Sequence, residues 1–295
     1  MVAIYAMGGG WGHLTRAVAL ARILDGPVIV FSNTAYADLV RSAEPGVTIE
    51  AGPPHHVLRR VSQIAPGTLV VDTFPRGVGG ELTCLLPRLK ARKVFVRRDL
   101  NPRYLAWANL EEWIRQHYDL VFIPGELEAN MPGTVVTPPW LVRDPAELPR
   151  QQRFDVLVCA AGNTQELEWY GQVARMLASR NINAACVAPT CPPGCPPELW
   201  VRHWPAIDLI SCARVVIGGG GYNTVYECQA CGVPLLAKPW PRKYDRQERR
   251  ARHSAAATVS TPEEAVAAAC SLLHTPTQTR PGPGGPPWQA ARLLR

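Results

Sequence analysis

Residues 214–247, which read RVVIGGGGYNTVYECQACGVPLLAKPWPRKYDRQ, contain the pattern that decides the fold. The apolar run at 215–217 predicts a buried strand, and the four glycines at 218–221 form a loop that opens a helix ending at Gly232. A second strand and a charged segment follow. This order predicts a βαβ unit of a parallel sheet.

The glycine loop predicts an anion-binding site. In parallel α/β sheets, ligands bind at the carboxyl ends of the strands. A loop that opens a helix there presents unpaired backbone N–H groups and the positive end of the helix dipole. Glycines allow the backbone to approach a ligand closely, because no Cβ intervenes.

The beginning of the chain has the same pattern. A strand is predicted at 2–6, a glycine loop at 7–12 and a helix at 13–24, with apolar residues recurring at intervals of three and four. The spacing Gly10-x-Gly12 lacks the third glycine of the dinucleotide fingerprint, since Leu14 and Thr15 stand near that offset. This argues against a nicotinamide-type cofactor.

Short apolar runs alternate with helix-length segments along the rest of the chain. In the first half, strands are predicted at 28–31, 47–50, 69–72, 94–97, 120–123 and 135–136, and helices at 35–42, 80–91 and 104–117. In the second half, strands are predicted at 154–159, 184–188 and 257–259, and helices at 165–179, 207–212, 261–273 and 288–294. The predicted fold class is α/β, with two Rossmann-like domains whose parallel sheets face each other across a cleft.

Residues 137–153 are rich in proline and show no periodicity, which indicates a domain boundary. We therefore predict an N-terminal Rossmann-like domain at 1–145 and a C-terminal one at 150–274. Residues 275–295 are predicted to be a Pro/Gly linker and a terminal helix.

The composition is typical of a soluble globular protein: 47% of the 295 residues are hydrophobic and 19% are charged. The chain opens directly into a strand, without a basic leader, and no apolar run is long enough for a bilayer span. The nine cysteines, an odd number, favour reduced thiols over a disulfide framework. We expect a cytoplasmic protein.

The net charge of +7 is concentrated in one segment, since residues 238–252 hold seven basic and two acidic side chains. Such a patch favours phosphates or an anionic membrane surface, which would place the protein peripherally at the inner membrane face. A solvated basic helix face is the alternative. Nucleic acid is not expected, because aromatic residues do not interleave with the basic ones.

Taken together, the two glycine-rich segments resemble glycosyltransferases of the GT-B fold. The resemblance is strongest to the family 28-like group that forms lipid II. Its motifs correspond here to Gly12-His13, the loop 218–221, Thr224-Val225-Tyr226-Glu227, Ala230-Cys231-Gly232-Val233-Pro234 and Asp245-Arg246-Gln247.

The resemblance implies roles for the residues on the donor side. Gly219, Gly220 and Gly221, with the N–H groups of Asn223 and Thr224, would cradle a diphosphate. Glu227 would accept hydrogen bonds from ribose hydroxyls, as a carboxylate can from two neighbouring donors.

Further donor contacts are implied elsewhere in the chain. Gln247, together with Asp245, would recognise hydroxyls of the sugar. The second phosphate-side loop corresponds to Asn163 and Thr164, the nucleobase site to Trp204, and the N-terminal donor contacts to Gly10, Gly12 and Arg16.

The sequence departs from the lipid II pattern at two places. Arg16 stands where that group has proline, and the resulting Gly-His-x-x-Arg is similar to the nucleotide-sugar hydrolase of pseudaminic acid synthesis. Pro205, which has no N–H, follows Trp204, so the expected uridine base is less well specified than the diphosphate.

His13 is the predicted general base, because it stands at a helix start and has a reference pKa near 6.5. Asp99 is the reserve candidate for the base. The structural alternatives are that His13 caps the helix and that Asp99 forms an ion pair with a neighbouring arginine. Arg16 could neutralise phosphate, hold the acceptor or be a surface residue. The loop-like segment 72–81 could recognise the acceptor or be only a turn.

No metal site is predicted. The sequence contains no Asp-x-Asp, and no histidine pair completes Cys228 and Cys231, or Cys191 and Cys195, to a zinc site. We expect no cofactor, because the nucleotide sugar is a substrate.

The sequence therefore predicts an inverting glycosyltransferase that moves a sugar from a nucleoside diphosphate sugar, with UDP as the expected nucleotide, to an unknown acceptor hydroxyl. The alternative is a nucleotide-sugar hydrolase with water as the acceptor. A sugar-nucleotide-binding protein without activity is a third possibility, against which the loop and Glu227 both argue.

Overall fold

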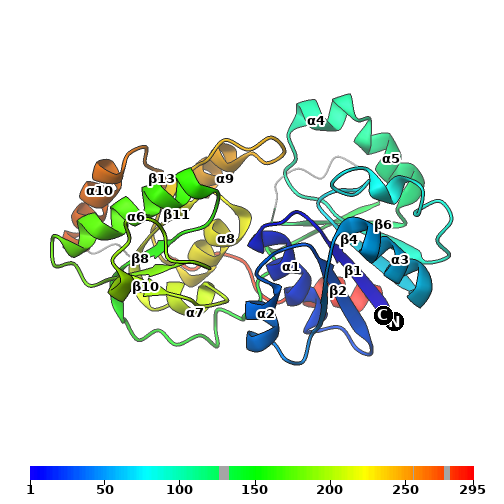
Figure 1. Cartoon of the computed structure of the whole chain (residues 1–295), viewed down its shortest axis with the longest axis horizontal. Helices are drawn as coiled ribbons and strands as arrows, with labels where there is room; N and C mark the ends of the chain where they lie inside the picture. The colour runs from blue at the N-terminus through cyan, green and yellow to red at the C-terminus, as the bar shows by residue number, and fades with distance from the viewer. Residues whose placement is uncertain (126–132, 255, 276–279) are drawn as a thin grey trace. The chain divides into compact units, whose positions relative to one another are not determined.

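The structure is a computed structural model that describes residues 1–125, 133–254, 256–275 and 280–295. Part of the predicted linker, 276–279, lies outside these residues. The chain forms two compact units. The first comprises Met1–Val142, Lys243–Asp245 and Gly285–Arg295, and the second comprises Arg143–Arg242 and Arg246–Gly284. Each unit is built on one parallel sheet, which confirms the predicted α/β class with two parallel-sheet domains (Figure 1).

The sheet of the first unit has seven strands in the order β3-β2-β1-β4-β5-β6-β7. These are β1 (Val2–Ala6), β2 (Val28–Ser32), β3 (Thr48–Ala51), β4 (Thr68–Asp72), β5 (Arg92–Val96), β6 (Leu120–Pro124) and β7 (Thr134–Thr137). The helices are α1 (Trp11–Ala21), α2 (Ala37–Ala43), α3 (Pro54–Ile64), α4 (Pro102–Trp107), α5 (Leu110–His117) and α11 (Trp288–Leu294), with a 3₁₀ turn at Glu81–Thr83.

The sheet of the second unit has six strands in the order β10-β9-β8-β11-β12-β13. These are β8 (Phe154–Cys159), β9 (Ala184–Val187), β10 (Trp200–Val201), β11 (Ala213–Gly219), β12 (Leu235–Lys238) and β13 (Ala257–Thr258). The helices are α6 (Thr164–Ala178), α7 (Ile207–Ile210), α8 (Tyr222–Cys231), α9 (Gln247–His253) and α10 (Pro262–His274), with a 3₁₀ turn at Pro197–Leu199.

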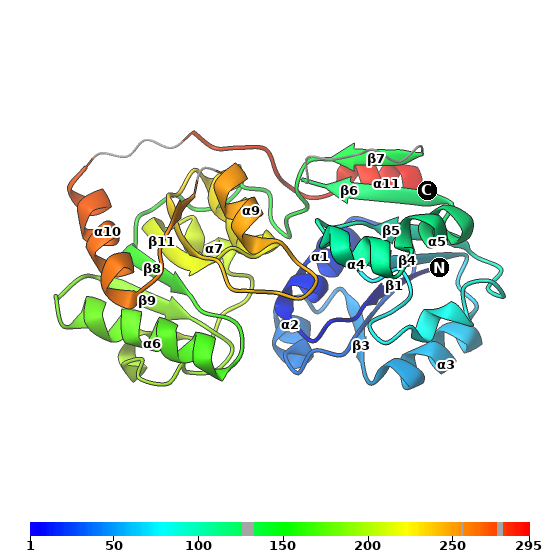
Figure 2. The ribbon, with the colours of Figure 1, turned by 90° about the horizontal axis from the view of Figure 1, so that it is seen from above.

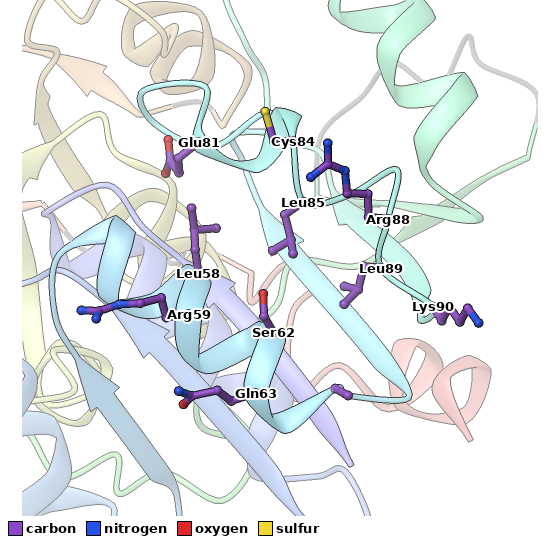
Figure 3. Close-up of a pocket in the computed structure, with 11 residues that line it drawn as sticks. Leu58, Arg59, Ser62, Gln63, Glu81, Cys84, Leu85, Arg88, Leu89 and Lys90 are labelled. Atoms are coloured by element: carbon purple, nitrogen blue, oxygen red, sulfur yellow. The ribbon is translucent and has the colours of Figure 1, made fainter.

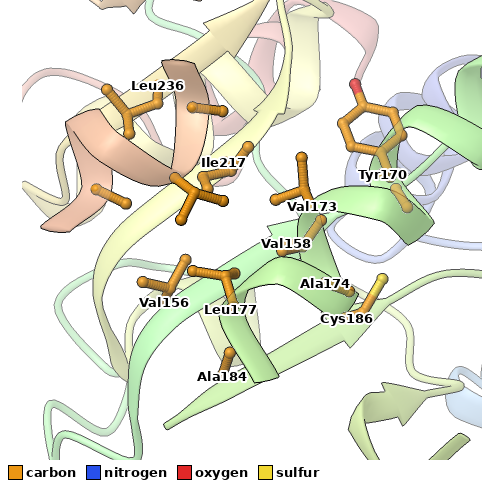
Figure 4. Packing of buried hydrophobic residues seen from close by; sticks show 14 of the residues in the cluster. Val156, Val158, Tyr170, Val173, Ala174, Leu177, Ala184, Cys186, Ile217 and Leu236 are labelled. Atoms are coloured by element: carbon orange, nitrogen blue, oxygen red, sulfur yellow. The ribbon is translucent and has the colours of Figure 1, made fainter. Parts of the chain in front are cut away.

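The apolar strands are buried because helices cover both faces of the second sheet. On one face, Tyr170, Val173 and Leu177 of α6 pack with Ile217 of β11 and Leu236 of β12 (Figure 4). On the other face, α7, α8 and α9 contribute side chains to a second cluster. Burial of one such side chain stabilises the fold by roughly 1.5–3 kcal/mol.

The strand order reverses beside β1 and β4 in the first sheet and beside β8 and β11 in the second. Chain connections leave these neighbouring central strands in opposite directions. The loops at their carboxyl ends therefore part and leave a crevice, which is where open parallel sheets bind ligands. Both glycine loops singled out from the sequence follow strands at these two points.

The predicted helix at 80–91 is wrong. The structure has only the 3₁₀ turn Glu81–Thr83 followed by turns up to β5. The Glu81 carboxylate accepts hydrogen bonds from the N–H groups of Val78 (3.1 Å) and Gly79 (2.7 Å) and from the hydroxyl of Tyr5. These contacts fold the segment back on itself, and Pro87 removes a further helical N–H.

Two other helices of the first unit differ from the prediction. The helix predicted at 104–117 is two helices, because Asn109 lies in the left-handed region with φ 45° and separates α4 from α5. Helix α3 was not predicted, because two histidines and four other polar residues obscure the spacing of its buried Val57 and Val61.

The C-terminal segment belongs to the first unit. The N–H of Leu141 donates to the carbonyl of Gly285 (2.9 Å), and Arg92 donates to the carbonyl of Leu293 (2.7 Å). Figure 2 shows α11 among the elements of the first unit. In the described part of the chain, no helix is long and apolar enough to cross a membrane.

Candidate active site

The glycine loop after β1 lies against the ring of His13. Gly8 and Gly9 have φ values of 150° and 72°, and both their N–H groups donate to the side-chain oxygen of Asn33 at 2.9 Å. A Cβ on Gly8 would stand 2.4 Å from the imidazole ring of His13. The loop therefore needs glycine at this position for His13 to occupy its place in the first turn of α1. Gly10 is the residue before α1, and Gly12 lies within its first turn.

His13 contacts a carboxylate from the neighbouring strand. Its Nδ1 lies 2.6 Å from Oδ2 of Asp72, the last residue of β4, and its side chain is 15% exposed. The ring of Phe74 stacks on it with centroids 5.5 Å apart. Burial lowers the pKa of His13, and although the Asp72 carboxylate acts in the opposite direction, the pKa stays below its ordinary value. The imidazole is therefore neutral at pH 7.

Arg16 holds the same carboxylate from the other side. Its Nε donates to Oδ1 of Asp72 at 3.0 Å and its Nη2 to Oδ2 at 2.7 Å, while the hydroxyl of Thr73 also donates to Oδ2. Arg16 is fully buried. Burial by itself would raise the pKa of Asp72, but the charge of Arg16 and the bonds from His13 outweigh it and hold this pKa well below its usual range. Asp72 is therefore a fixed anion.

This arrangement has a clear chemical consequence. A carboxylate that accepts from Nδ1–H fixes the tautomer with its lone pair on Nε2, as in other histidine bases. His13 is thereby set up as a proton acceptor, with Asp72 as the residue that orients it and Arg16 as the residue that orients Asp72.

Sequence reasoning missed Asp72 as the partner of His13. The carboxylate at His13 comes from β4, whereas Asp99, the reserve candidate for the base, follows β5 and is half-buried; its role stays a prediction. The signal was nevertheless present: Asp72 ends an apolar strand, and β4 is the strand beside β1 at the reversal of the sheet order. The sequence alone does not show which strand pairs with β1, and this pairing was needed to identify Asp72.

In the second unit, the four-glycine loop joins β11 to α8. Gly221 is the residue before the helix, and no side chain caps it. A Cβ on Gly218 would stand 2.8 Å from the Thr224 side chain, and one on Gly220 would stand 2.8 Å from the carbonyl oxygen of Gln247. A Cβ on Gly221 would meet nothing within 4 Å. The loop is thus closely packed on the protein side and open at Gly221, beside the N–H groups of Asn223 and Thr224.

The loop after the neighbouring strand β8 is held by an ion pair in which the carboxylate is buried. Asn163 caps α6 by accepting from the N–H of Glu166 at 3.0 Å, and Thr164 begins the helix. The Glu166 carboxylate, 4% exposed, accepts from both terminal nitrogens of Arg242 at 2.5 Å. Because β8 and β11 pair directly, the two loops lie at adjacent strand ends. Neither Glu166 nor Arg242 was predicted from the sequence, although Asn163-x-x-Glu166 is a helix-capping pattern.

Glu227 is a buried carboxyl group on α8, 3% exposed. Burial, and secondarily the charge of Asp208, raises its pKa to about 8. Among the described residues it makes no hydrogen bond or ion pair that compensates its burial. A buried carboxyl group in this condition is stabilised by a ligand that donates hydrogen bonds.

The structure also describes the three remaining donor-side candidates, which are Gln247, Asp245 and Trp204. Gln247 begins α9, and its side-chain oxygen accepts from the N–H of Trp240 at 2.9 Å. Asp245 accepts from Arg98 at 3.2 Å within the first unit. Trp204 is buried, with 3% of its surface exposed. Their roles toward a donor stay predictions.

Several basic side chains of the segment 238–252 form contacts within the protein. Lys238 donates to the carbonyl of Ser260 at 2.8 Å, Arg250 donates to that of Gly220 at 3.1 Å, and Arg242 holds Glu166. Contact with an anionic membrane, and a cytoplasmic location, stay predictions.

Cys228, from the Cys228-x-x-Cys231 pair, lies in the hydrophobic core. Cys228 is buried and packs with Val225 in the cluster beneath α8. Throughout the part of the chain that the structure describes, no group of three or more His, Cys, Asp or Glu side chains is placed to hold a metal ion.

Neither a protein-family model nor a curated protein matches the sequence. Solved structures do match. Spinosyn forosaminyltransferase SpnP is 16% identical, with a TM-score of 0.64 over 93% of this chain and 90% of that one. SsfS6, a glycosyltransferase from Streptomyces sp. SF2575, is 16% identical, with a TM-score of 0.59 over 92% of each chain.

A third match carries a ligand. Spinosyn rhamnosyltransferase SpnG complexed with thymidine diphosphate is 14% identical, with a TM-score of 0.56 over 93% of this chain and 92% of that one. At such identities the likeness establishes the fold. The chain therefore has the two-domain GT-B fold of these glycosyltransferases.

Proposed function

We propose that the protein is a glycosyltransferase that moves a sugar from a nucleoside diphosphate sugar to an acceptor hydroxyl, with inversion at the anomeric carbon. The observation that carries the proposal is the contact of 2.6 Å between His13 and Asp72 beside a glycine loop, at the reversal point of a GT-B sheet. A surface or capping histidine would not need a buried carboxylate that Arg16 also orients.

In the proposed reaction, Nε2 of His13 removes the proton from the acceptor hydroxyl as its oxygen attacks the anomeric carbon. The Asp72 carboxylate stabilises the imidazolium that forms, while Arg16 keeps Asp72 ionised. A direct attack opposite the leaving diphosphate inverts the anomeric centre.

The second unit binds the donor in this proposal. The N–H groups at the start of α8, including those of Asn223 and Thr224, stabilise the charge that develops on the leaving diphosphate. Glu227 accepts hydrogen bonds from the ribose hydroxyls, which offsets its burial. Gln247, also in the second unit, recognises the sugar.

Uridine is our proposed nucleoside. Thymidine is the alternative, because the structure of SpnG contains thymidine diphosphate. Titration of the protein with UDP and with thymidine diphosphate, monitored by calorimetry, distinguishes them. Tighter binding of thymidine diphosphate would overturn the choice of uridine without affecting the proposal of glycosyl transfer.

The test of the proposed function is a panel of nucleotide sugars incubated with and without hydroxyl acceptors, in which free nucleoside diphosphate is measured. We expect release that depends on the acceptor. His13→Ala should lose turnover by about 10²–10⁴-fold while it keeps its affinity for the nucleotide, because the base does not bind the donor. His55→Ala, on the exposed side of α3, is the matched control.

Two further results of the same assay are informative. Release at full rate without acceptor would establish the hydrolase that Gly12-His13-x-x-Arg16 suggests. We also expect EDTA to leave turnover unchanged, because N–H groups at a helix start can carry the role of a cation at the diphosphate. A loss of activity that Mg²⁺ restores would contradict this.

A further inference from the structure

Three cysteines of the second unit, Cys186, Cys191 and Cys195, form a cluster outside the site described above. Cys186 lies in β9 and is fully buried, Cys195 is 7% exposed, and Cys191 is exposed. Cys186 and Cys195 belong to the same hydrophobic core, and Figure 4 shows Cys186 within it. The cysteine cluster therefore leads from the surface into the core, and the glycosyl transfer proposed above does not use it.

The backbone brings Cys191 and Cys195 close together. The N–H of Cys195 donates to the carbonyl of Pro192 at 3.0 Å and closes a β-turn whose third residue, Gly194, has φ 79°. The thiol of Cys191 donates to the carbonyl oxygen of Cys195 at 3.8 Å. The turn packs directly on Gly171 of α6, where an added Cβ would stand 1.9 Å from a carbonyl oxygen of the turn. Packing therefore fixes the position of both cysteines.

The side chain of Cys195 interacts with both other cysteines of the cluster. Its sulfur accepts hydrogen bonds from the thiols of Cys186 and Cys191, and the bond from Cys186 is the main reason why the pKa of Cys195 lies below its ordinary value. Burial and the charge of Glu198 act in the opposite direction. The same hydrogen bond, together with burial, raises the pKa of Cys186. Cys195 is thus the thiol whose ionisation the cluster favours, and the thiolate is the nucleophile in disulfide exchange.

We propose that the cysteine cluster is a redox modification site, at which Cys191 and Cys195 form a reversible disulfide by exchange with a low-molecular-weight disulfide such as oxidised glutathione. The proposal is independent of the proposed glycosyl transfer. A transient disulfide of this kind is compatible with a protein whose cysteines are otherwise reduced.

The exchange takes two steps. The exposed Cys191, as its thiolate, attacks one sulfur of the small disulfide, so that a mixed disulfide forms on Cys191 and one small thiolate leaves. The thiolate of Cys195 then attacks the sulfur of Cys191 and displaces the second small thiolate. Each leaving thiolate takes up the proton that a protein thiol has lost. Overall two protein thiols are oxidised to one disulfide and the small disulfide is reduced to two thiols.

The test uses the full-length protein in glutathione buffers in which the ratio of the oxidised to the reduced form is varied. Free thiols are alkylated with N-ethylmaleimide in urea, and trypsin then releases residues 181–202 as one peptide that contains all three cysteines. We expect this peptide to carry an internal disulfide in oxidising buffer, with the alkyl group on Cys186. Dithiothreitol should reverse the change.

Cys84 is the internal control. It is exposed in the first unit, and no second cysteine is among the described residues that surround it between α3 and residues 81–90 (Figure 3). We expect Cys84 to stop at the mixed disulfide with glutathione, because no neighbouring thiolate displaces the small thiol.

Variants separate the roles of the three cysteines. Cys191→Ser, at an exposed position, should leave the peptide without a disulfide, because Cys195 and Cys186 are buried from the small disulfide. Cys195→Ser should stop Cys191 at the mixed disulfide. In the Cys191→Ser background, Cys186→Ala should move the pH dependence of Cys195 alkylation by iodoacetamide to higher pH, because the hydrogen bond that lowers the pKa of Cys195 is lost.

The proposal would be overturned by any of three results. A parent protein in which Cys191 stops at the mixed disulfide would show that Cys195 does not attack it. An alkyl group on Cys191, with the disulfide between Cys186 and Cys195, would assign the reaction to a different pair. An unchanged pH dependence after Cys186→Ala would show that Cys186 does not control the thiolate of Cys195.

Discussion

Three side chains of the first unit share one buried carboxylate. Asp72 accepts from His13 at 2.6 Å and from Arg16 at 2.7 and 3.0 Å, so protein groups compensate its charge. The fully buried Arg16 has the geometry of a positioning residue, because its guanidinium group donates hydrogen bonds to Asp72 and to Thr73. The Gly-His-x-x-Arg pattern thus has a structural explanation that does not require a hydrolase.

Replacement of Asp72 by asparagine tests this relation. Asp72→Asn should lower kcat by about 10²–10⁴-fold, because the amide neither fixes the tautomer nor stabilises the imidazolium. The Asp72 carboxylate raises the pKa of His13, so the acid limb of the pH–rate profile should move to lower pH in the variant. Asp38→Asn, at an exposed carboxylate, is the control. An acid limb that moves to higher pH would contradict the arrangement.

Glu227 combines burial with a pKa of about 8, above the ordinary 4.5. A carboxyl group whose pKa is raised by folding disfavours the folded state once it ionises. Its contribution to the free energy of unfolding therefore falls as the pH rises from about 4.5 to about 8. A ligand whose hydroxyl groups donate hydrogen bonds to the ionised carboxylate would reverse this loss of stability.

Glu227→Gln should accordingly raise the free energy of unfolding at about pH 9 by on the order of a few kcal/mol, and Tm with it, and the gain should vanish toward pH 5. The same variant should bind nucleoside diphosphate more weakly, as measured by calorimetry. Glu147→Gln, at an exposed position, should change neither quantity. Equal affinity of the parent protein for ribo- and deoxyribonucleotides would disprove the ribose contact.

At the scale of elements, the strand–glycine loop–helix unit occurs in each half, and its glycines are not equivalent. Gly220 is required by packing, since a Cβ there would stand 2.8 Å from a backbone oxygen, whereas Gly221 borders open space with φ −69°. An alanine at Gly221 is compatible with the fold but stands where the backbone would approach a diphosphate.

This difference predicts separate effects on stability and binding. Gly221→Ala should leave Tm nearly unchanged and weaken nucleoside diphosphate binding, because its methyl group prevents the close approach of the anion. Gly220→Ala should lower both, because the loop must move away from Gln247. Melting curves and titrations of the two variants provide the measurement, and unchanged binding in Gly221→Ala would place the diphosphate elsewhere.

At the scale of the molecule, the two units differ in how the chain builds them. Both units are built from separate stretches of chain, but the last stretch of the first unit, Gly285–Arg295, returns to it after the second unit is complete. Ala290, Ala291 and Leu294 of α11 are buried there. The stability of the first unit therefore depends on residues that are last in the sequence.

Truncation after residue 284 should reveal this dependence. We expect hydrogen exchange to accelerate in β1, β4 and β5 of the first unit, while β8 and β11 of the second keep their protection. Deletion of Arg295 alone, an exposed residue, is the control. Uniform acceleration in both units would show that they unfold as one.

The sequence by itself determined the α/β class, most strands and the two glycine loops, because hydrophobic periodicity and glycine placement are local properties. The strand at Val2–Ala6, the strand at Phe154–Cys159 and the helix at Trp288–Leu294 were predicted with their observed bounds. Local signals failed at residues 80–91, where Glu81 bonds to Tyr5 and the preceding loop in place of helix formation.

Only the tertiary structure decided the partners. Asp72 lies 59 residues from His13, and Arg242 lies 76 residues from Glu166, and no local pattern joins such pairs. They meet because parallel pairing brings β4 beside β1, and because the fold of the second unit brings the loop after β12 to the start of α6. The sequence determines the chemical type of each side chain. Burial and proximity, which set the pKa values of His13 and Glu227, arise only on folding.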